Sequence, residues 1–331
     1  MPAVAAPIAP RPRRGSIWFA AISFVLLAAV IVVVVTVAKG GTTSDNPFVG
    51  TSLYAYPDSS AAKAAKLANG TEQSAPFASL ARTPTAIWLL PEAHPTGEIT
   101  EFVSRIEADA AVTSQLPVFV VYGIPSRDCD NFSAGGAGTQ EYPLWVSAIA
   151  NGIATHPAII ILEPDALALS PSCGTQDATA AFLQDAISRL STNPATTIYL
   201  DGGHSGWLKP EEMAPLLKAA GVDKVRGFAT NVSNYNSTQD ERAFGEALSE
   251  LLGGAHFVVD TSRNGQGSAG EWCNPPGRTV GDTPSGVDDG TAQDASLWIK
   301  NPGESDGECN GGPPAGQWWP SQAVELAGGG M

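Results

Sequence analysis

Acidic residues recur at the points where apolar runs of this sequence end. After the run Ala158–Leu162, for example, Glu163 comes next and Asp165 follows two residues later. If such runs are parallel strands, their carboxyl ends meet at one edge of the sheet, and the acidic side chains gather there. Gathered carboxyl groups permit acid–base hydrolysis of an acetal, in which one carboxyl is protonated and another is ionised. The acids at these positions are Asp128, Glu163, Asp165, Asp201, Asp260 and Asp306.

The same carboxyl groups could instead coordinate a metal ion, for which Asp201, His204 and Asp260 are the candidates. The sequence has only four histidines, and none of them forms an HxH or HExxH pair. We therefore expect no metal site. No GxGxxG or GxxxxGK[ST] motif follows an apolar run, so no nucleotide cofactor is expected either.

Tryptophans lie close to the same run ends, at Trp88, Trp207 and Trp272. An indole ring can stack on the apolar C–H face of a sugar, while amides and charged groups bind its hydroxyls. A single tryptophan is as often a core residue as a binding residue. Three tryptophans near the acids at the strand ends together favour a carbohydrate-binding site.

Apolar runs alternate with helical patterns after residue 50, which indicates βαβ units and a parallel sheet. Several runs are apolar on both faces, as expected when helices cover both sides of a sheet. We predict a distorted seven-stranded parallel β/α barrel, with a flat doubly wound sheet as the alternative. The predicted strands are Ala86–Leu90, Pro117–Tyr122, Ala158–Leu162, Thr197–Asp201, Arg226–Thr230, His256–Asp260 and Leu297–Lys300. The predicted helices are Glu98–Ala111, Leu144–His156, Thr175–Leu190, Pro210–Ala220 and Gln239–Leu252.

The N-terminal region predicts export. Three arginines precede a strongly apolar stretch from Ile17 to Ala38, long enough to span a bilayer as a helix. Basic residues on the N-terminal side favour that side staying in the cytoplasm. An uncleaved anchor is preferred over a signal peptide cleaved after Thr36-Val37-Ala38. The predicted segments are 1–14 cytoplasmic, 15–39 anchor or signal, 40–50 linker and 51–331 catalytic domain.

The exported part carries a strong negative charge, since residues 1–39 hold four of the 18 basic residues and none of the 33 acidic ones. Such a surface repels phosphate backbones, so nucleic acid is not an expected partner. Contact with the membrane is expected through the N-terminal segment alone. A neutral polymer is compatible with this charge, and the exported part is expected to be a monomer.

The four cysteines, Cys129, Cys173, Cys273 and Cys309, all lie in the part predicted to be exported. They form no CxxC pair, which argues against a zinc ribbon or a thioredoxin-type site. Two disulfides are expected in an oxidising compartment, and spacing alone leaves three pairings open.

Six motifs occur in the order and approximate spacing of glycoside hydrolase family 6, the cellulase family. They are VVYGIPSRDCDNFSAGGA, IIILEPDALAL, YLDGGHSGWL, GFATNVSNYN, VVDTSRNGQG with EWCNPPGR, and LWIKNPGESDG. The resemblance covers roughly residues 50 to 328. It implies a β/α barrel that hydrolyses β-1,4-glucan or cello-oligosaccharides with inversion and without a cofactor.

The resemblance also assigns roles to individual residues. Asp165 matches the proton donor, Asp128 the aspartate that tunes this donor and helps to position water, and Asp306 the usual general base. Tyr122 matches the tyrosine near the sugar that is distorted. Inversion implies donor and base carboxyls roughly 6.5–9.5 Å apart. The positions that match glucan-binding residues are His204, Trp207, Asn231, Trp272, Lys300 and Glu304.

The resemblance further implies disulfides Cys129–Cys173 and Cys273–Cys309, each clamping a loop that bears a catalytic acid. For two acids a structural reading competes with the functional one: Asp128 could pair with Arg127, and Glu304 with Lys300. Asp201 and Asp260 are left out of the catalytic set as equally good structural residues.

The sequence departs from the family pattern at Gly123 and Gly202, where larger residues are usual. The short segment between Cys273 and Lys300 favours an open-cleft endoglucanase over an exo-acting cellobiohydrolase. Two more functions compete with these: a catalytically silent carbohydrate-binding protein on the same scaffold, and a hydrolase of a different neutral glycan.

Overall fold

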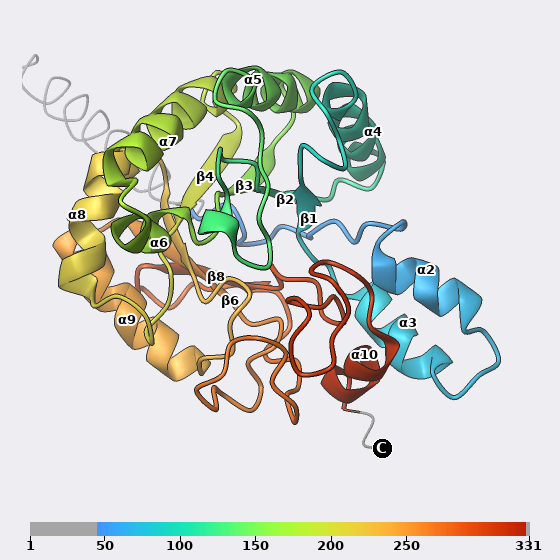
Figure 1. Cartoon of the computed structure of the whole chain (residues 1–331). Coiled ribbons are helices and arrows are strands. Elements are labelled where there is room, and N and C mark those ends of the chain that lie inside the picture. Colours follow the sequence, from blue (N-terminus) through green and yellow to red (C-terminus); the bar gives the residue numbers. More distant parts are fainter. Residues whose placement is uncertain (1–44, 329–331) are drawn as a thin grey trace, which may run out of the picture. The chain divides into compact units, whose positions relative to one another are not determined.

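The computed structural model describes residues 45–328, in which the residues from Asn46 onward form one compact unit. Its centre is a curled sheet of eight strands in the order β1-β2-β3-β4-β5-β6-β8-β7 (Figure 1). Seven strands are parallel to their neighbours, and β7 pairs with β8 in antiparallel orientation. The strands are β1 Ile87–Leu89, β2 Val118–Val121, β3 Ala158–Leu162, β4 Thr196–Asp201, β5 Gly227–Thr230, β6 His256–Asp260, β7 Ser285–Gly286 and β8 Gln293–Leu297.

The two faces of this sheet bury different side chains, because successive residues of a strand point to opposite faces. In β3, Ile160 and Leu162 belong to the large cluster packed against the helices. Ile159 and Ile161 belong to a second cluster, on the opposite face. All five residues of β3 are buried, which is why the sequence shows an uninterrupted apolar run there.

The sheet does not close into a barrel by strand pairing in the described part of the chain, and here the prediction of a barrel needs correction. Between β1 and the end of β8 one backbone hydrogen bond forms, from the amide of Ala86 to the carbonyl of Trp298 at 2.9 Å. The predicted strand Leu297–Lys300 is also wrong, since β8 ends at Leu297. The amides of Ile299 and Lys300 donate instead to the carboxylate of Asp260, at 3.1 and 3.0 Å.

Helices cover the outer face of the sheet in chain order. Helices α4, α5, α7, α8 and α9 follow one another around the curl, and each packs against the next (Figure 1). All five were predicted from the sequence, with boundaries shifted by three residues or fewer. Their bounds are α4 Ile99–Val112, α5 Tyr142–Ile153, α7 Gln176–Leu190, α8 Pro210–Ala220 and α9 Thr238–Leu251.

Local sequence signals fix several helix ends. Helix α9 begins after Ser237, whose hydroxyl accepts a hydrogen bond from the amide of Asp240 at 3.1 Å. Helix α8 begins with Pro210 and ends at Ala220, and the next residue, Gly221, adopts the left-handed conformation with φ of 91°. Shorter elements were not predicted: α2 Ser60–Leu67, α3 Ser74–Arg82, η1 Asp128–Asp130, α6 Ala166–Cys173, η2 Val222–Lys224 and α10 Pro320–Leu326.

The N-terminal boundary differs from the predicted one. Asn46 donates to the carbonyl oxygens of Val287 and Asp294 at 2.8 Å, and Phe48 is buried against the sheet. The compact unit therefore starts at Asn46, inside the predicted linker 40–50. The predicted cytoplasmic segment 1–14 and anchor 15–39 lie outside the described residues. Within residues 45–328, none of the helices has the length and apolar character needed to span a membrane.

Candidate active site

Asp165 lies in the tight turn that leads from the carboxyl end of β3 into α6. Glu163 and Asp165 both adopt left-handed backbone conformations there, with φ of 51° and 68°. Such conformations cost about 1–3 kcal/mol each and persist only where surrounding contacts enforce them. One such contact is the hydrogen bond from the amide of Asp165 to Oδ1 of Asp201 at 3.0 Å. Asp201 therefore holds the turn that presents the Asp165 carboxyl group.

The surroundings of Asp165 favour its protonated form. Burial is the largest cause and raises its pKa well above the ordinary value. The negative charges of Asp201, Asp128 and Asp306 raise it further, whereas the positive charge of Lys300 opposes them. A carboxyl group that keeps its proton near neutral pH can donate it to a leaving oxygen.

Glu163 is 1% exposed and holds the neighbouring strand end in place. Its Oε1 accepts hydrogen bonds from the amide of Gly123 at 3.0 Å and the hydroxyl of Tyr142 at 2.9 Å. Its Oε2 accepts from the amides of Gly123 and Ile124, both at 3.0 Å. Burial raises its pKa to about 7. This positioning role was not predicted, since the sequence shows only an acid after an apolar strand.

The glycine at position 123, a departure from the family pattern, has a packing reason. A Cβ atom on Gly123 would lie 2.6 Å from the ring of Trp145. Trp145 is fully buried, and its indole nitrogen donates to the carbonyl of His94 at 2.8 Å. In this chain the tryptophan thus fills the space beside residue 123.

Asp128 lies in the loop after β2, with a left-handed φ of 59°. Its Oδ2 accepts the amide of Ser133 at 2.8 Å, and burial raises its pKa. The competing idea of a salt bridge with Arg127 is not supported, because Arg127 pairs with Glu92 at 3.2 Å. The Arg127 guanidinium also lies 4.5 Å from the ring centre of Tyr122 and donates to its carbonyl oxygen. The Asp128 carboxyl group is therefore not paired with Arg127, and Arg127 instead holds Tyr122 in place.

Asp306 is the most heavily bonded of the predicted catalytic acids. Arg263, which is fully buried, contacts its Oδ1 at 2.9 Å, and Nζ of Lys300 lies 3.8 Å from the same oxygen. Its Oδ2 accepts from the Tyr235 hydroxyl and the Asn274 amide, both at 3.0 Å. Both oxygens are therefore engaged by neighbouring groups, which fix the position of the carboxylate.

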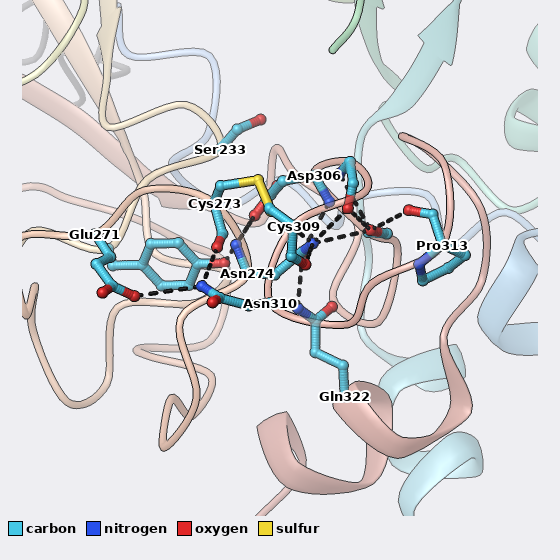
Figure 2. The surroundings of a disulfide bond; sticks show 12 residues. Ser233, Glu271, Cys273, Asn274, Asp306, Cys309, Asn310, Pro313 and Gln322 are labelled. Atoms are coloured by element: carbon cyan, nitrogen blue, oxygen red, sulfur yellow. Dashed lines mark hydrogen bonds between the residues drawn. A yellow bond between two sulfur atoms is a disulfide. The ribbon is translucent and has the colours of Figure 1, made fainter.

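Asn274 organises the loop that carries Asp306 (Figure 2). Its Oδ1 accepts the amide of Asp306 at 2.9 Å, and its Nδ2 donates to the carbonyl of Gly307 at 2.8 Å. Gln322 adds a hydrogen bond to the same Oδ1 at 3.2 Å. Arg263, Tyr235 and Asn274 occur within or beside the six family motifs, but nothing in the sequence singled them out.

Both disulfides have the pairing implied by the family resemblance, Cys129–Cys173 and Cys273–Cys309. The first joins the residue next to Asp128 to the end of α6. The second joins the residue before Asn274 to the loop just after Asp306 (Figure 2). Each bridge therefore limits the motion of a loop that bears one of the acids.

A cleft of about 650 Å³ opens beside these loops, at the ends of β1, β2 and β8. Trp88 and Tyr122 line it with their rings in an edge-to-face arrangement, 5.1 Å between centres. The indole nitrogen of Trp88 donates to the carbonyl of Ile299 at 2.8 Å, which fixes the ring. Lys300 and Glu304 line the same cleft. They do not pair with each other: Lys300 faces Asp306 at 3.8 Å, and Glu304 accepts from Asn301 at 3.2 Å.

The remaining predicted glucan-binding residues include three from the loops after β4 and β5, on the far side of β3 from that cleft. His204 and Trp207 lie together, with 5.6 Å between ring centres. Burial lowers the pKa of His204 to about 4, so its imidazole is neutral above that pH. Asn231 is fully buried, and its amide group donates to the backbone carbonyls of Asn236 and Asp260. Asn231 has no exposed surface through which it could bind a sugar directly.

Trp272 is 53% exposed and lies beside Phe132, which is 51% exposed, with 5.9 Å between ring centres. Phe132 belongs to the loop of Asp128, and Trp272 precedes the disulfide that clamps the loop of Asp306. The Phe132 ring also covers Gly307, where an added Cβ would lie 2.8 Å from it. The two acid-bearing loops therefore touch through exposed aromatic residues.

Asp260 has the structural role that the sequence left open. Besides the two amides after β8, its carboxylate accepts the amides of Ser233 and Ser262 at 3.1 and 2.9 Å. Asp201 likewise binds backbone amides, those of Asp165 and Gly203. Within residues 45–328, no three His, Cys, Asp or Glu side chains are grouped so that they could hold a metal ion.

Comparison with known proteins finds a matching family and several similar proteins. The family model "Glycosyl hydrolases family 6" matches residues 48–329. Endoglucanase A of Cellulomonas fimi is 44% identical over 278 residues, which cover 83% of this chain and 60% of that protein. A probable 1,4-beta-D-glucan cellobiohydrolase C of Aspergillus fumigatus is 33% identical over 82% of this chain and 71% of its own length.

Among solved structures, the endoglucanase Cel6 of Mycobacterium tuberculosis has a similar fold, with a TM-score of 0.82. It is 42% identical, and the match covers 86% of this chain and 99% of that one. That structure contains methyl-cellobiosyl-4-deoxy-4-thio-beta-D-cellobioside.

Proposed function

Because the chain belongs to glycosyl hydrolases family 6, we propose that it hydrolyses internal β-1,4-glucosidic bonds of cellulose or a related β-glucan. The observation that supports this best is the state of Asp165. It lies at a strand end among three other carboxyl groups, and burial and their charges raise its pKa, which favours its protonated form. This is the condition that a general acid must meet at near-neutral pH.

In the proposed reaction Asp165 donates its proton to the glycosidic oxygen as the bond to the anomeric carbon breaks. A water molecule attacks that carbon from the opposite face, which inverts its configuration. The proton released by water goes toward Asp128. Its Oδ2 accepts the amide of Ser133 at 2.8 Å, and burial raises its pKa, which helps this carboxylate to take up a proton.

Asp306 has a different part in this proposal. Its ion pairs with Arg263 and Lys300 and its two further hydrogen bonds hold its carboxylate in place. A fixed negative charge stabilises the positive charge that develops on the sugar ring in the transition state. We therefore propose that Asp306 acts through its charge, and that the role of general base passes to Asp128.

The substrate is proposed from the walls of the site. Trp88 and Tyr122 present aromatic surface in the cleft, and Lys300 and Glu304 offer hydrogen-bonding groups for sugar hydroxyls. His204 and Trp207 continue the binding surface beyond β3, so that a chain would lie across Asp165 with units on both sides. Asn231 supports this surface from below through Asn236.

Internal cleavage is proposed from the short segment between Cys273 and Lys300, together with the similarity to proteins named endoglucanases. The similarity to a protein named cellobiohydrolase keeps exo action as the alternative. Export is proposed from the apolar stretch before residue 39 and from the two disulfides, which persist in oxidising compartments.

The test is hydrolysis of carboxymethyl cellulose by the full-length protein, followed by both reducing-end release and viscosity. We expect the viscosity to fall early, while few reducing ends have formed, because internal cuts shorten chains fastest. A matched rise of reducing ends with little loss of viscosity would support exo action. No release by a folded protein that still binds cello-oligosaccharides would support the silent binding protein instead.

A further inference from the structure

Buried hydrogen bonds behind His204 leave only one consistent arrangement of donors and acceptors. The arrangement starts at Asn231, whose Nδ2 contacts two backbone carbonyl oxygens, those of Asp260 at 2.9 Å and Asn236 at 3.2 Å. Carbonyl oxygens only accept, so this end of the Asn231 amide must be the NH₂ group. Its Oδ1 must therefore face Asn236, where it accepts the backbone amide at 3.1 Å.

The orientation of the Asn236 side chain follows from that of Asn231. The Asn231 Oδ1 can only accept, and the nearest side-chain atom of Asn236 lies 3.2 Å from it. That atom must therefore be Nδ2, which donates. The same Nδ2 lies 2.9 Å from Nδ1 of His204. The backbone carbonyl of Asn236 is held from another side by Nδ2 of Asn264 at 3.1 Å.

The state of the His204 ring then follows. Its Nδ1 faces two donors, Nδ2 of Asn236 and the backbone amide of Gly206 at 3.2 Å. A ring nitrogen that faces two donors must accept, so in the neutral imidazole the proton resides on Nε2. Among the described residues Nε2 of His204 has no hydrogen-bond partner, and the ring lies beside Trp207.

We propose that Asn236, oriented by Asn231, is a positioning residue that fixes His204 as a neutral Nε2–H donor toward a glucan hydroxyl. This inference rests on the proposed function, because it takes His204 and Trp207 as part of the sugar-binding surface. In this proposal Asn231 acts indirectly, by orienting Asn236. Such a role needs no exposed surface, and Asn231 has none. Burial keeps the pKa of His204 low, which agrees with a neutral ring.

The residue that changes the arrangement with least change of shape is aspartate at position 236. In Asn236→Asp an acceptor replaces the NH₂ group beside Nδ1, so the ring proton is drawn to Nδ1. The new charge also raises the pKa of His204. Two other acids bind the residues on either side of His204: Glu241 on α9 accepts the amide of Ser205 at 2.9 Å, and Asp201 on β4 accepts the amide of Gly203 at 3.0 Å. The test is therefore made at pH 8, to favour the neutral ring.

The experiment records long-range proton–nitrogen correlation spectra of the ¹⁵N-labelled full-length protein. Wild type is expected to show a protonated Nε2 and an unprotonated Nδ1 for His204, assigned by the loss of these signals in His204→Gln. Asn236→Asp is expected to show the reverse. His94, His156 and His256 serve as internal references for correct folding in each variant.

A matched control exists in the same loop. Asn234 donates to the carbonyl of Val232 at 3.0 Å and carries the same amide group. Asn234→Asp makes the same change of charge and is expected to leave the His204 signals in place. A protonated Nδ1 in wild type, or an unchanged Nε2–H in Asn236→Asp, would overturn the proposal.

Binding of a thio-linked cello-oligosaccharide, which resists hydrolysis, links the ring to the sugar. At pH 8 the dissociation constant is expected to rise about threefold to tenfold in Asn236→Asp, the loss of one net hydrogen bond. A reversed proton position with unchanged affinity would overturn the link to the sugar. Failure of the wild type to hydrolyse any β-glucan would refute the proposed function, while the ring spectra would still decide the positioning role.

Discussion

Replacing Glu107 by glutamine measures what it costs this fold to bury a carboxyl group outside the proposed active site. Glu107 lies on α4 and is 2% exposed. Its Oε1 has no hydrogen-bond partner among the described residues. It borders a cavity of about 420 Å³ at the amino ends of the strands, beside Leu116 and Pro157. Burial raises its pKa from 4.5 to about 8.

This pKa determines how stability depends on pH. When folding raises the pKa of an acid, the protonated acid adds to the free energy of unfolding. For Glu107 this contribution is complete below the unfolded pKa of 4.5 and is lost as the pH rises to about 8. At about 1.4 kcal/mol per pH unit, the whole interval corresponds to about 5 kcal/mol. Water in the adjoining cavity reduces this cost, so we expect about 2–4 kcal/mol.

Glutamine has nearly the shape of a protonated glutamate and never ionises. Glu107→Gln is therefore expected to match wild type at pH 4.5 and to exceed its free energy of unfolding by about 2–4 kcal/mol at pH 8. Urea unfolding at both pH values measures the difference. Glu101→Gln, at an exposed position on the same helix, is the control and is expected to change neither value. An equal effect of Glu107→Gln at both pH values would refute the reasoning.

Three further predictions concern the candidate site. Tyr142→Phe removes the hydroxyl bonded to Glu163 and is expected to lower the free energy of unfolding by about 1–2 kcal/mol, measured in urea; an unchanged value would contradict the role given to this buried bond. The double change Cys273→Ser and Cys309→Ser opens a loop of 36 residues and is expected to cost about 4 kcal/mol, with reduced glucan hydrolysis by a protein that stays folded. Full activity in that variant would show that the clamp is not needed to hold Asp306. Trp88→Ala is expected to raise the KM for cellotetraose about tenfold, or about 1.4 kcal/mol, with little change in kcat; an unchanged KM would remove Trp88 from the binding surface.

The first six strands and the five long helices could be predicted because local composition and global fold agree there. The run Ala158–Leu162 is apolar at every position, and the structure buries every position. The error at the last strand has a long-range cause. Trp298 and Ile299 are apolar enough for a strand, but the carboxylate of Asp260, 39 residues before Ile299, binds the amides that a neighbouring strand would have used.

Among the site residues, Asp165 was predictable because it follows a strand end, and Asp128, Asp306 and the disulfides were predictable because of the family motifs. The residues that hold them were not. Glu163 binds backbone amides about 40 residues away, and Arg263 reaches Asp306 across 43 residues. Such contacts depend on which loops the curled sheet brings together. This arrangement of loops cannot be predicted from any local pattern in the sequence.

The central claim is that Asp165 supplies the proton to the leaving group, and the most direct measurement compares two substrates in Asp165→Asn. Asp177→Asn, at an exposed position on α7, is the matched control. Hydrolysis of cellotetraose needs protonation of a poor leaving group, so its rate is expected to fall by about 10³-fold or more in Asp165→Asn. Hydrolysis of 2,4-dinitrophenyl β-cellobioside needs no such proton, so most of its rate is expected to remain. An equal loss on both substrates, or no loss on cellotetraose, would contradict the account.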